Sequence, residues 1–261
     1  MSGHAACPRL TIAQDLTHLV PVLADWILDQ AKQAIAARGQ FVWALPGGNT
    51  PKALFAYLAE PAVQARWPWP QIHLVIGDER DVHPTHPDSN FGMIYRELLA
   101  RLSPPPGRVV RFWTECPPAV ARAHYEAELA GLPRDASGYP TLDLALLGLG
   151  PEGHFASLFP QAPALSDTGW TSYTWVPQLG SHRYTLTLPV LCAAREVAFL
   201  AAGEEKRSAV QQAMADSPED PTTPIAQLRA CRLRRRPDEA WSHWFLDQNA
   251  DSGLSSAASK V

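Results

Sequence analysis

The sequence predicts an α/β protein with a mainly parallel, Rossmann-like open sheet and helices on both faces. Short apolar runs, typical of buried strands, alternate along the chain with longer segments whose apolar residues recur at helical spacing. Two of these runs end in glycine-rich turns, at 46–51 and 148–153. Ligands of open α/β sheets bind just beyond the carboxyl ends of strands, so both turns are candidate binding positions.

For the first 40 residues we expect an irregular start followed by helix. Residues 1–10 are expected to be loose, whereas the apolar positions of 11–38 fall near a helical period. Pro21 is expected to divide this stretch into a short segment and a longer helix, and Gly39 to end it.

A strand at 41–45, a glycine turn and a helix at 52–58 come next. Thr50 suits the helix cap and Pro51 the first helical position. The turn would then present free backbone N–H groups at the positive end of a helix, a natural cradle for one phosphoryl group. An ordinary capped helix would explain the same residues, since this is neither the dinucleotide fingerprint nor a Walker A sequence.

Charged residues follow the next strand, predicted at 72–76. Asp78, Glu79 and Arg80 would be costly there unless they are solvated, paired or in contact with a ligand, and an exposed loop with a local Asp–Arg pair is the open alternative. The nearby His83, His86 and Asp88 do not have the spacing of a metal site, so no metal is predicted. Ser89 and Asn90 can cap a helix at 91–101.

The remaining elements continue the alternation. Strands are predicted at 109–112, 142–147, 170–176, 184–188, 197–202 and 239–246, and helices at 119–130, 204–215 and 224–230. Lys206 falls in the first turn of a helix, where it opposes the dipole unless an anion is near; a solvated side chain is the alternative. We expect one domain over residues 1–247 and a disordered, small and polar tail at 248–261.

His154 is the main candidate for chemistry. It ends the turn in which Gly148, Gly150 and Gly153 let the chain reverse tightly after a buried strand. A histidine at such a strand end is placed for proton transfer near neutral pH. A histidine that packs on the loop or caps the next helix is the competing interpretation.

Composition narrows the classes of partner and compartment. The formal net charge of −4 argues against bulk attraction to nucleic acid, and the basic run at 232–236 is interpreted as a solvated edge. The four scattered cysteines are expected to be free thiols in a reducing compartment. With no apolar run long enough to span a membrane and no secretion signal, we expect a cytoplasmic protein, monomeric or a weak homo-oligomer.

Three segments together resemble the 6-phosphogluconolactonase family, which shares its fold with glucosamine-6-phosphate isomerases/deaminases. They are LPGGNTP at 45–51, GDER at 77–80 with DSN at 88–90, and GLGPEGHFASLFP at 148–160; RYTLTL at 183–188 also fits. The likeness covers roughly residues 15 to 247, and the ending ASLFP is similar to the lactonase branch. The chain departs from the usual family residues at Pro46, Asn49, Glu152 and Phe155. The first two leave the backbone cradle intact, and Phe155 is expected to reshape the pocket wall.

The resemblance implies hydrolysis of 6-phosphoglucono-δ-lactone to 6-phosphogluconate, the second oxidative step of the pentose phosphate pathway, without metal or organic cofactor. It implies that His154 is the general base, that Arg80 stabilises the oxyanion, and that Asp78 orients His154 or a substrate hydroxyl. The 6-phosphate would be held by Gly47, Gly48, Asn49, Thr50, Arg183 and Lys206. The rival functions are an amino-sugar-phosphate isomerase/deaminase, with Asp78 as the base, and a non-catalytic sugar-phosphate sensor.

Overall fold

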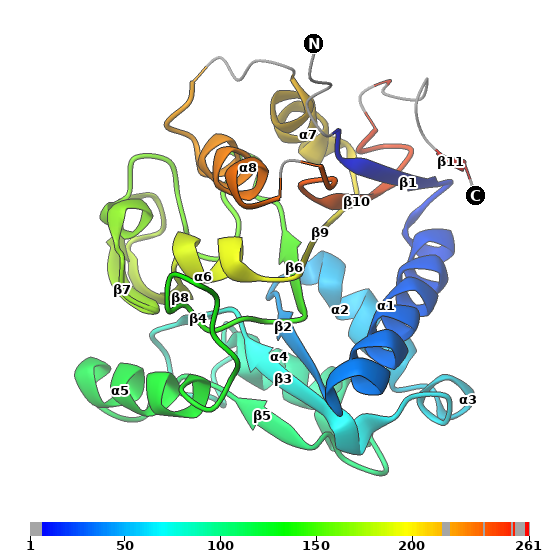
Figure 1. Ribbon diagram of the computed structural model, residues 1–261, viewed down its shortest axis with the longest axis horizontal. Helices are drawn as coiled ribbons and strands as arrows, with labels where there is room; N and C mark the ends of the chain where they lie inside the picture. The colour runs from blue at the N-terminus through cyan, green and yellow to red at the C-terminus, as the bar shows by residue number, and fades with distance from the viewer. Residues whose placement is uncertain (1–6, 216–219, 237, 252, 254–258, 261) are drawn as a thin grey trace.

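The computed structural model describes residues 7–215, 220–236, 238–251, 253 and 259–260 (Figure 1). The strands are β1 (Arg9–Ala13), β2 (Phe41–Leu45), β3 (Ile72–Ile76), β4 (Asp78–Arg80), β5 (Arg108–Val110), β6 (Leu144–Gly148), β7 (Thr171–Val176), β8 (Ser181–Leu186), β9 (Glu196–Ala201), β10 (His243–Asp247) and β11 (Ser259–Lys260). The α-helices are α1 (Leu16–Arg38), α2 (Asn49–Leu58), α3 (Pro61–Gln64), α4 (Asn90–Glu97), α5 (Pro118–Leu129), α6 (Leu188–Ala193), α7 (Arg207–Met214) and α8 (Pro224–Arg235). Short 3₁₀ helices lie at Trp69–Gln71, Leu99–Arg101, Pro163–Ser166, Pro177–Leu179 and Glu204–Lys206.

The central sheet is parallel throughout, in the order β11-β1-β10-β9-β6-β2-β3-β5. From β2 the chain continues to β3 and β5 on one side, whereas from β6 it continues to β9 and β10 on the other. The sheet therefore changes direction between the neighbouring strands β2 and β6, and such a switch point is where open α/β sheets bind ligands. Both predicted glycine turns leave the sheet there. A small antiparallel sheet, in the order β4-β8-β7, lies beside this switch point and brings β4 and β8 to it.

Side chains alternate across the central sheet and create two apolar layers. On one face, Phe41, Trp43 and Leu45 of β2 pack with α1, α2 and α4. On the other, Val42 and Ala44 pack with the group that contains α5, α6, α7 and α8. Figure 1 shows α1 on one side of the strands and α6 and α8 on the other. Helices on both faces of a parallel sheet confirm the predicted fold class.

Two predictions for the amino-terminal region were wrong. Within the described part of the supposed loose start, Arg9 begins β1, a strand too short to stand out as a periodic pattern; residues 1–6 lie outside the described residues. Pro21 does not break the helix, which runs unbroken from Leu16 to Arg38. Its missing N–H would have paired with the carbonyl of Thr17, an exposed residue of the first turn, where water can solvate that oxygen.

The basic run at 232–236 is not simply a solvated edge. The helix predicted at 224–230 extends to Arg235, and Arg232 is only 1% exposed. Its guanidinium donates hydrogen bonds to the carbonyls of Trp241, Cys192, Ala194 and Arg195. The planar fork thus ties α8 to the end of α6, and four carbonyl acceptors offset the burial of the charge. Sequence spacing alone does not reveal which arginine of such a run faces inward.

The tail predicted at 248–261 is described only in part. Ser259 and Lys260 form β11, which pairs in parallel with β1 at the edge of the central sheet. Residues 252, 254–258 and 261 lie outside the described residues. No helix of the described chain is long and apolar enough to cross a membrane.

Candidate active site

A cavity of about 210 Å³ lies at the switch point of the sheet. All nine residues predicted for the site line it: Gly47, Gly48, Asn49, Thr50, Asp78, Arg80, His154, Arg183 and Lys206. They come from the carboxyl ends of β2, β6 and β9 and from the small sheet. The imidazole and the first glycine turn, which are far apart in sequence, therefore face the same crevice.

The first glycine turn begins α2 without a side-chain cap. Gly48, at φ +98°, is the residue before the helix, and α2 begins at Asn49, so Thr50 is not the cap that we predicted. The first N–H groups of α2 are left without a side-chain acceptor, which keeps them available to an anion. Gly47 has a separate reason to be glycine: a Cβ there would lie 1.9 Å from Oδ1 of Asn90.

Asp78 is buried and held by two neutral side chains. Its Oδ2 accepts from Ser157 Oγ at 2.7 Å, and its Oδ1 accepts from Asn90 Nδ2 at 3.2 Å. Asn90 also donates to the Asp78 carbonyl at 2.9 Å. Among the described residues, no hydrogen bond joins Asp78 to His154. Asp78 nevertheless acts on that imidazole through its charge, which opposes the lowering of the His154 pKa by burial.

Glu79 is a buried carboxylate that joins β4 to the start of α4 next to the cavity. It is 1% exposed, and its oxygens accept from the backbone N–H groups of Arg80, Asn90 and Phe91 and from the hydroxyl of Ser89. Ser89 in turn caps α4, as predicted, by accepting from the N–H of Gly92. Burial raises the pKa of Glu79, although the three backbone hydrogen bonds oppose the shift. The carboxylate fixes the start of α4 against β4.

Replacing Glu79 by alanine is expected to destabilise the fold. The Glu79→Ala variant leaves several buried donors at the start of α4 without an acceptor, so the free energy of unfolding should fall by about 2–3 kcal/mol. Urea unfolding measures the change. Asp29→Ala, which alters an exposed carboxylate of α1, is the control and should stay within about 0.5 kcal/mol of the parent. Equal midpoints for both variants would contradict this role.

His154 is held by its own turn and by an aromatic ring. The ring stacks on Phe159 with centroids 4.0 Å apart, and a Cβ on Gly150 would lie 2.0 Å from Nδ1. Only glycine at position 150 therefore leaves room for the imidazole. The Gly150 N–H donates to the carbonyl of His154, and the Gly153 N–H to that of Gly150, which closes the turn.

The environment of His154 favours the neutral imidazole. Burial lowers its pKa, while the nearby carboxylates of Glu152 and Asp78 oppose the shift. Oε1 of Glu152 lies 3.1 Å from Nδ1, close in distance but without the geometry of a hydrogen bond. No hydrogen bond to Nε2 occurs among the described residues, so this nitrogen is available to a ligand. A neutral imidazole with a free nitrogen can accept a proton.

Three cations face the cavity. The β4–β8 pairing sets Arg80 opposite Arg183, and the charge of Arg80 adds to burial in lowering the pKa of Arg183. Nη1 of Arg80 donates to the carbonyl of Asp88 at 2.5 Å. Lys206 ends a 3₁₀ turn that leads directly into α7. It therefore lies in the first turn of the predicted helix, but that turn is 3₁₀ and not α-helical.

The cavity is therefore electropositive and suited to an anion. Among the described residues, neither Arg183 nor Lys206 has an ion-pair partner within 4 Å, and the one hydrogen bond of the Arg80 guanidinium goes to a carbonyl. Two close guanidiniums repel each other unless an anion lies between them. The same cavity thus offers cations, the start of α2 and a neutral imidazole.

Sequence reasoning missed several supporting residues. Asn90 was interpreted as a helix cap and Glu79 as one charge of a loop. Both, like Ser157, also belonged to a motif of the family resemblance, but none of the three was given a role in the site. Glu152, a departure from the usual family residue, is the carboxylate nearest to the imidazole. The signal that could have found Asn90 is its place in the DSN triplet, which the family resemblance already included. Phe155 is buried against Phe199 and lines the wall, as expected.

Comparison with known families matches most of the chain. The model of the glucosamine-6-phosphate isomerases/6-phosphogluconolactonase family matches residues 14–235. A protein of Nostoc sp. (strain PCC 7120) named 6-phosphogluconolactonase is 39% identical over 246 residues, which cover 94% of this chain and 97% of that protein. One of Synechocystis sp. (strain PCC 6803) with the same name is 39% identical over 85% of this chain and 88% of its own.

Solved structures extend the likeness to the fold. The 6-phosphogluconolactonase of Trypanosoma brucei superposes with a TM-score of 0.82 at 26% identity, over 96% of this chain and 100% of its own. That of Leishmania guyanensis gives 0.79 at 29% identity, over 95% and 99%. A monomeric glucosamine-6-phosphate deaminase gives 0.69 at 16% identity, over 93% and 98%, and at that identity shares the fold alone.

Proposed function

The chain belongs to the glucosamine-6-phosphate isomerase/6-phosphogluconolactonase family, and from this premise we propose that it hydrolyses 6-phosphoglucono-δ-lactone to 6-phosphogluconate. The single observation that carries the proposal is the shared cavity, in which a neutral histidine faces an unpaired set of cations and a free helix start. The names and structures of the relatives support the same activity. The reaction would be the lactone-opening step of the oxidative pentose phosphate pathway.

The phosphate end fixes the substrate. The free N–H groups at the start of α2, together with Arg183 and Lys206, suit a phosphate dianion, since hydrogen bonds between charged partners are about twice as strong as neutral ones. Binding at that end directs the lactone ring toward the imidazole. The remote phosphate thereby lowers the entropic cost of bringing the ester carbonyl to the base.

The reaction begins at the imidazole of His154. Nε2 of His154 accepts a proton from water, whose oxygen attacks the lactone carbonyl carbon. The carbonyl oxygen becomes an oxyanion, and Arg80 stabilises it by its charge. When the intermediate collapses, the ring C–O bond breaks and the imidazolium returns its proton to the departing ring oxygen. Glu152 favours the imidazolium through its charge, and Asp78, held by Asn90 and Ser157, is placed to accept from a substrate hydroxyl.

A coupled assay of lactone hydrolysis tests the proposal. It should follow 6-phosphogluconate formation at slightly acidic pH, where spontaneous opening is slow, and we expect a rate well above the uncatalysed one. Glucosamine 6-phosphate should release no ammonia. Ammonia release without lactone turnover would instead support the deaminase, and binding of sugar phosphate without any turnover would support the sensor.

A further inference from the structure

Two cysteines lie together at the contact between α6 and α8, outside the cavity described above. Cys192 of α6 is 1% exposed and belongs to the apolar layer, and Cys231 of α8 packs against that layer while remaining partly accessible. Both are free cysteines, and their side chains contact each other where α6 packs against α8. The proposed reaction uses neither of them.

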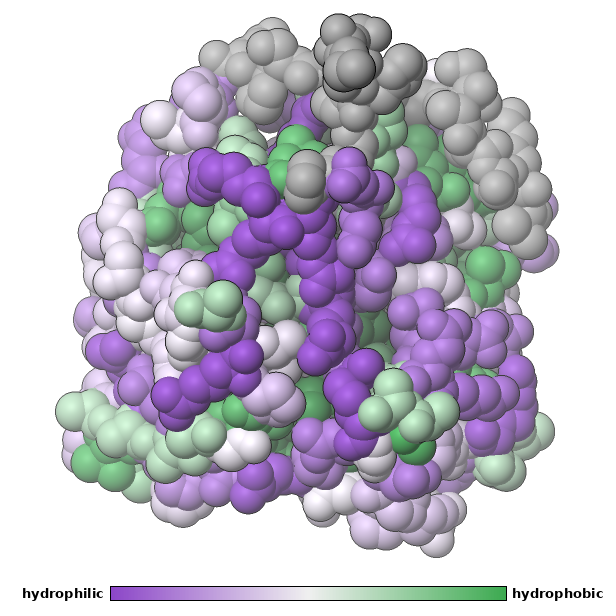
Figure 2. Space-filling view, in the orientation of Figure 1, coloured by the Kyte–Doolittle hydropathy of each residue, from purple (hydrophilic) through white to green (hydrophobic). Residues whose placement is uncertain are grey.

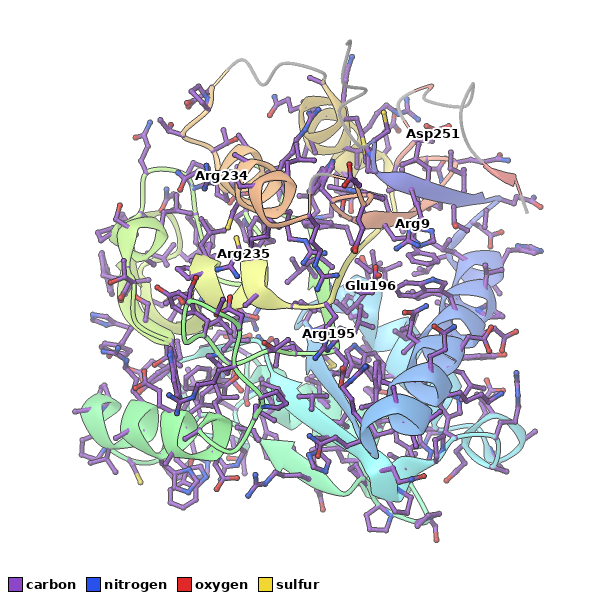
Figure 3. All side chains as sticks on the ribbon, viewed as in Figure 1. Arg9, Arg195, Glu196, Arg234, Arg235 and Asp251 are labelled. Carbon is purple, nitrogen blue, oxygen red and sulfur yellow. The ribbon has the colours of Figure 1, made fainter. Side chains whose placement is uncertain are left out.

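Positive charges lie close to Cys231, since two arginines of α8 act on it. The guanidinium of Arg235 lies beside Cys231, one turn further along α8, and the charge of Arg234 acts on the same thiol. Figure 3 shows Arg234 and Arg235 at the end of α8, with Arg235 next to α6. Asp135 pairs with Arg235 and partly offsets it. Arg232, from the same helix, donates to the Cys192 carbonyl and keeps the end of α6 against α8.

Exposure and charge distinguish the two sulfurs. Contact with Cys192 and the charge of Arg235 lower the pKa of Cys231, whereas contact with Cys231 and burial raise the pKa of Cys192. Cys231, which is partly accessible and beside a cation, is therefore the sulfur better placed to react, and Cys192 is its buried neighbour. Reactive cysteines in proteins have this setting, a partly exposed thiolate beside a cation. Figure 2 shows a band of hydrophilic residues across the face of the molecule that Figure 1 presents with α8 and α6.

We propose that Cys231 and Cys192 form an oxidisable dithiol that reacts with hydroperoxides, Cys231 as the attacking thiolate and Cys192 as the resolving thiol. In the first step the Cys231 sulfur attacks a peroxide oxygen, the O–O bond breaks, and the chain is left with a sulfenic acid while water is released. In the second, Cys192 loses its proton and attacks that sulfur, the S–O bond breaks, and hydroxide leaves as water. Two thiols and one H₂O₂ thus give one disulfide and two waters.

The disulfide would join α6 to α8 and enclose the segment between them, which contains β9, Lys206 and α7. The proposal is independent of the proposed hydrolysis, because neither sulfur lines the cavity. The dithiol can therefore be tested without any assay of turnover.

Mass spectrometry of the full-length chain tests the pair. The reduced protein is treated with stoichiometric H₂O₂ at neutral pH, remaining thiols are alkylated, and the chain is digested. We expect a reversible disulfide between the peptides of Cys192 and Cys231, cleaved by dithiothreitol, with Cys116 still alkylated. A dominant disulfide through Cys7 or Cys116, or equal oxidation of all four cysteines, would overturn the proposal.

Single variants separate the two roles. Cys231→Ser should abolish the fast oxidation, and Cys192→Ser should let Cys231 stop at a sulfenic acid that dimedone traps. Cys116→Ser is the matched control and should oxidise like the parent. In the reduced parent, iodoacetamide should alkylate Cys231 at least about tenfold faster than Cys116 at neutral pH, because only the thiolate reacts. Equal alkylation rates, or a Cys231→Ser variant that consumes peroxide at the parental rate, would contradict the assignment.

Discussion

The His154→Ala variant is expected to lose between about 10² and 10⁴ of the lactonase kcat while it remains folded. Among the described residues that line the cavity, His154 is the neutral imidazole with a ring nitrogen that makes no hydrogen bond. General acid–base catalysis contributes about 10²–10⁴ to the rate. Substrate affinity should change little, because the phosphate end lies on other elements. The measurement is a steady-state comparison of kcat and KM in the coupled assay, with circular dichroism to show that the fold persists.

The pH dependence of the parent gives a second readout of the same group. Protonated His154 cannot accept a proton, so kcat/KM should fall as the pH drops through its pKa. Since burial lowers that pKa from the ordinary value of 6.5, the midpoint should lie below pH 6.5. Glu152→Gln removes the nearest opposing charge, so it should move the midpoint lower still.

An exposed histidine provides the control for this series. His18→Ala alters an exposed residue of α1 and should leave kcat and the pH midpoint unchanged. Full activity in His154→Ala would remove the residue from the mechanism. A large loss of affinity with normal kcat would show that His154 binds substrate instead of moving a proton.

The sequence was most informative where a short motif and a strand end coincide. The runs at 41–45 and 72–76 were predicted with the bounds of β2 and β3, because a short run of apolar, β-prone residues, interrupted only by His73 in the second case, stands directly before a turn. The family resemblance implied that His154 and the turn at Gly47 and Gly48 act on the same substrate, and both follow predicted strands. Their meeting depends on β2 and β6 being neighbours, which local patterns alone could not establish.

What sequence reasoning could not supply is the inward direction of polar side chains. Glu79 was one of three consecutive charges, and only the position of α4 shows that its carboxylate caps that helix. Arg232 was one of four basic residues, and only the packing of α6 shows that it is buried. In both cases burial of the charge is tolerated because the side chain has hydrogen-bond partners. Most of these partners come from segments distant in sequence, so a local sequence pattern does not reveal them.

The Arg183→Ala variant is expected to weaken capture of the phosphorylated substrate. Arg183 faces the cavity from β8 without an ion-pair partner among the described residues, so a bound phosphate would gain its full charge-assisted contact. Loss of a hydrogen bond to a charged group costs about 1.5–3 kcal/mol, which corresponds to a fall of roughly 10- to 150-fold in kcat/KM. Most of the loss should be in KM, because the phosphate is bound equally in the ground and transition states.

A substrate without the phosphate separates this role from a structural one. With glucono-δ-lactone, Arg183→Ala and the parent should have nearly equal kcat/KM, because no phosphate contact remains to be lost. Arg66→Ala, at an exposed arginine paired with Asp25, is the control and should leave both substrates unaffected. An equal loss with both lactones would mean that Arg183 shapes the cavity or acts on the reacting carbonyl. Because Arg80 lies opposite Arg183 on β4, that outcome would shift the oxyanion role to the pair of guanidiniums and leave the phosphate to Lys206 and the start of α2.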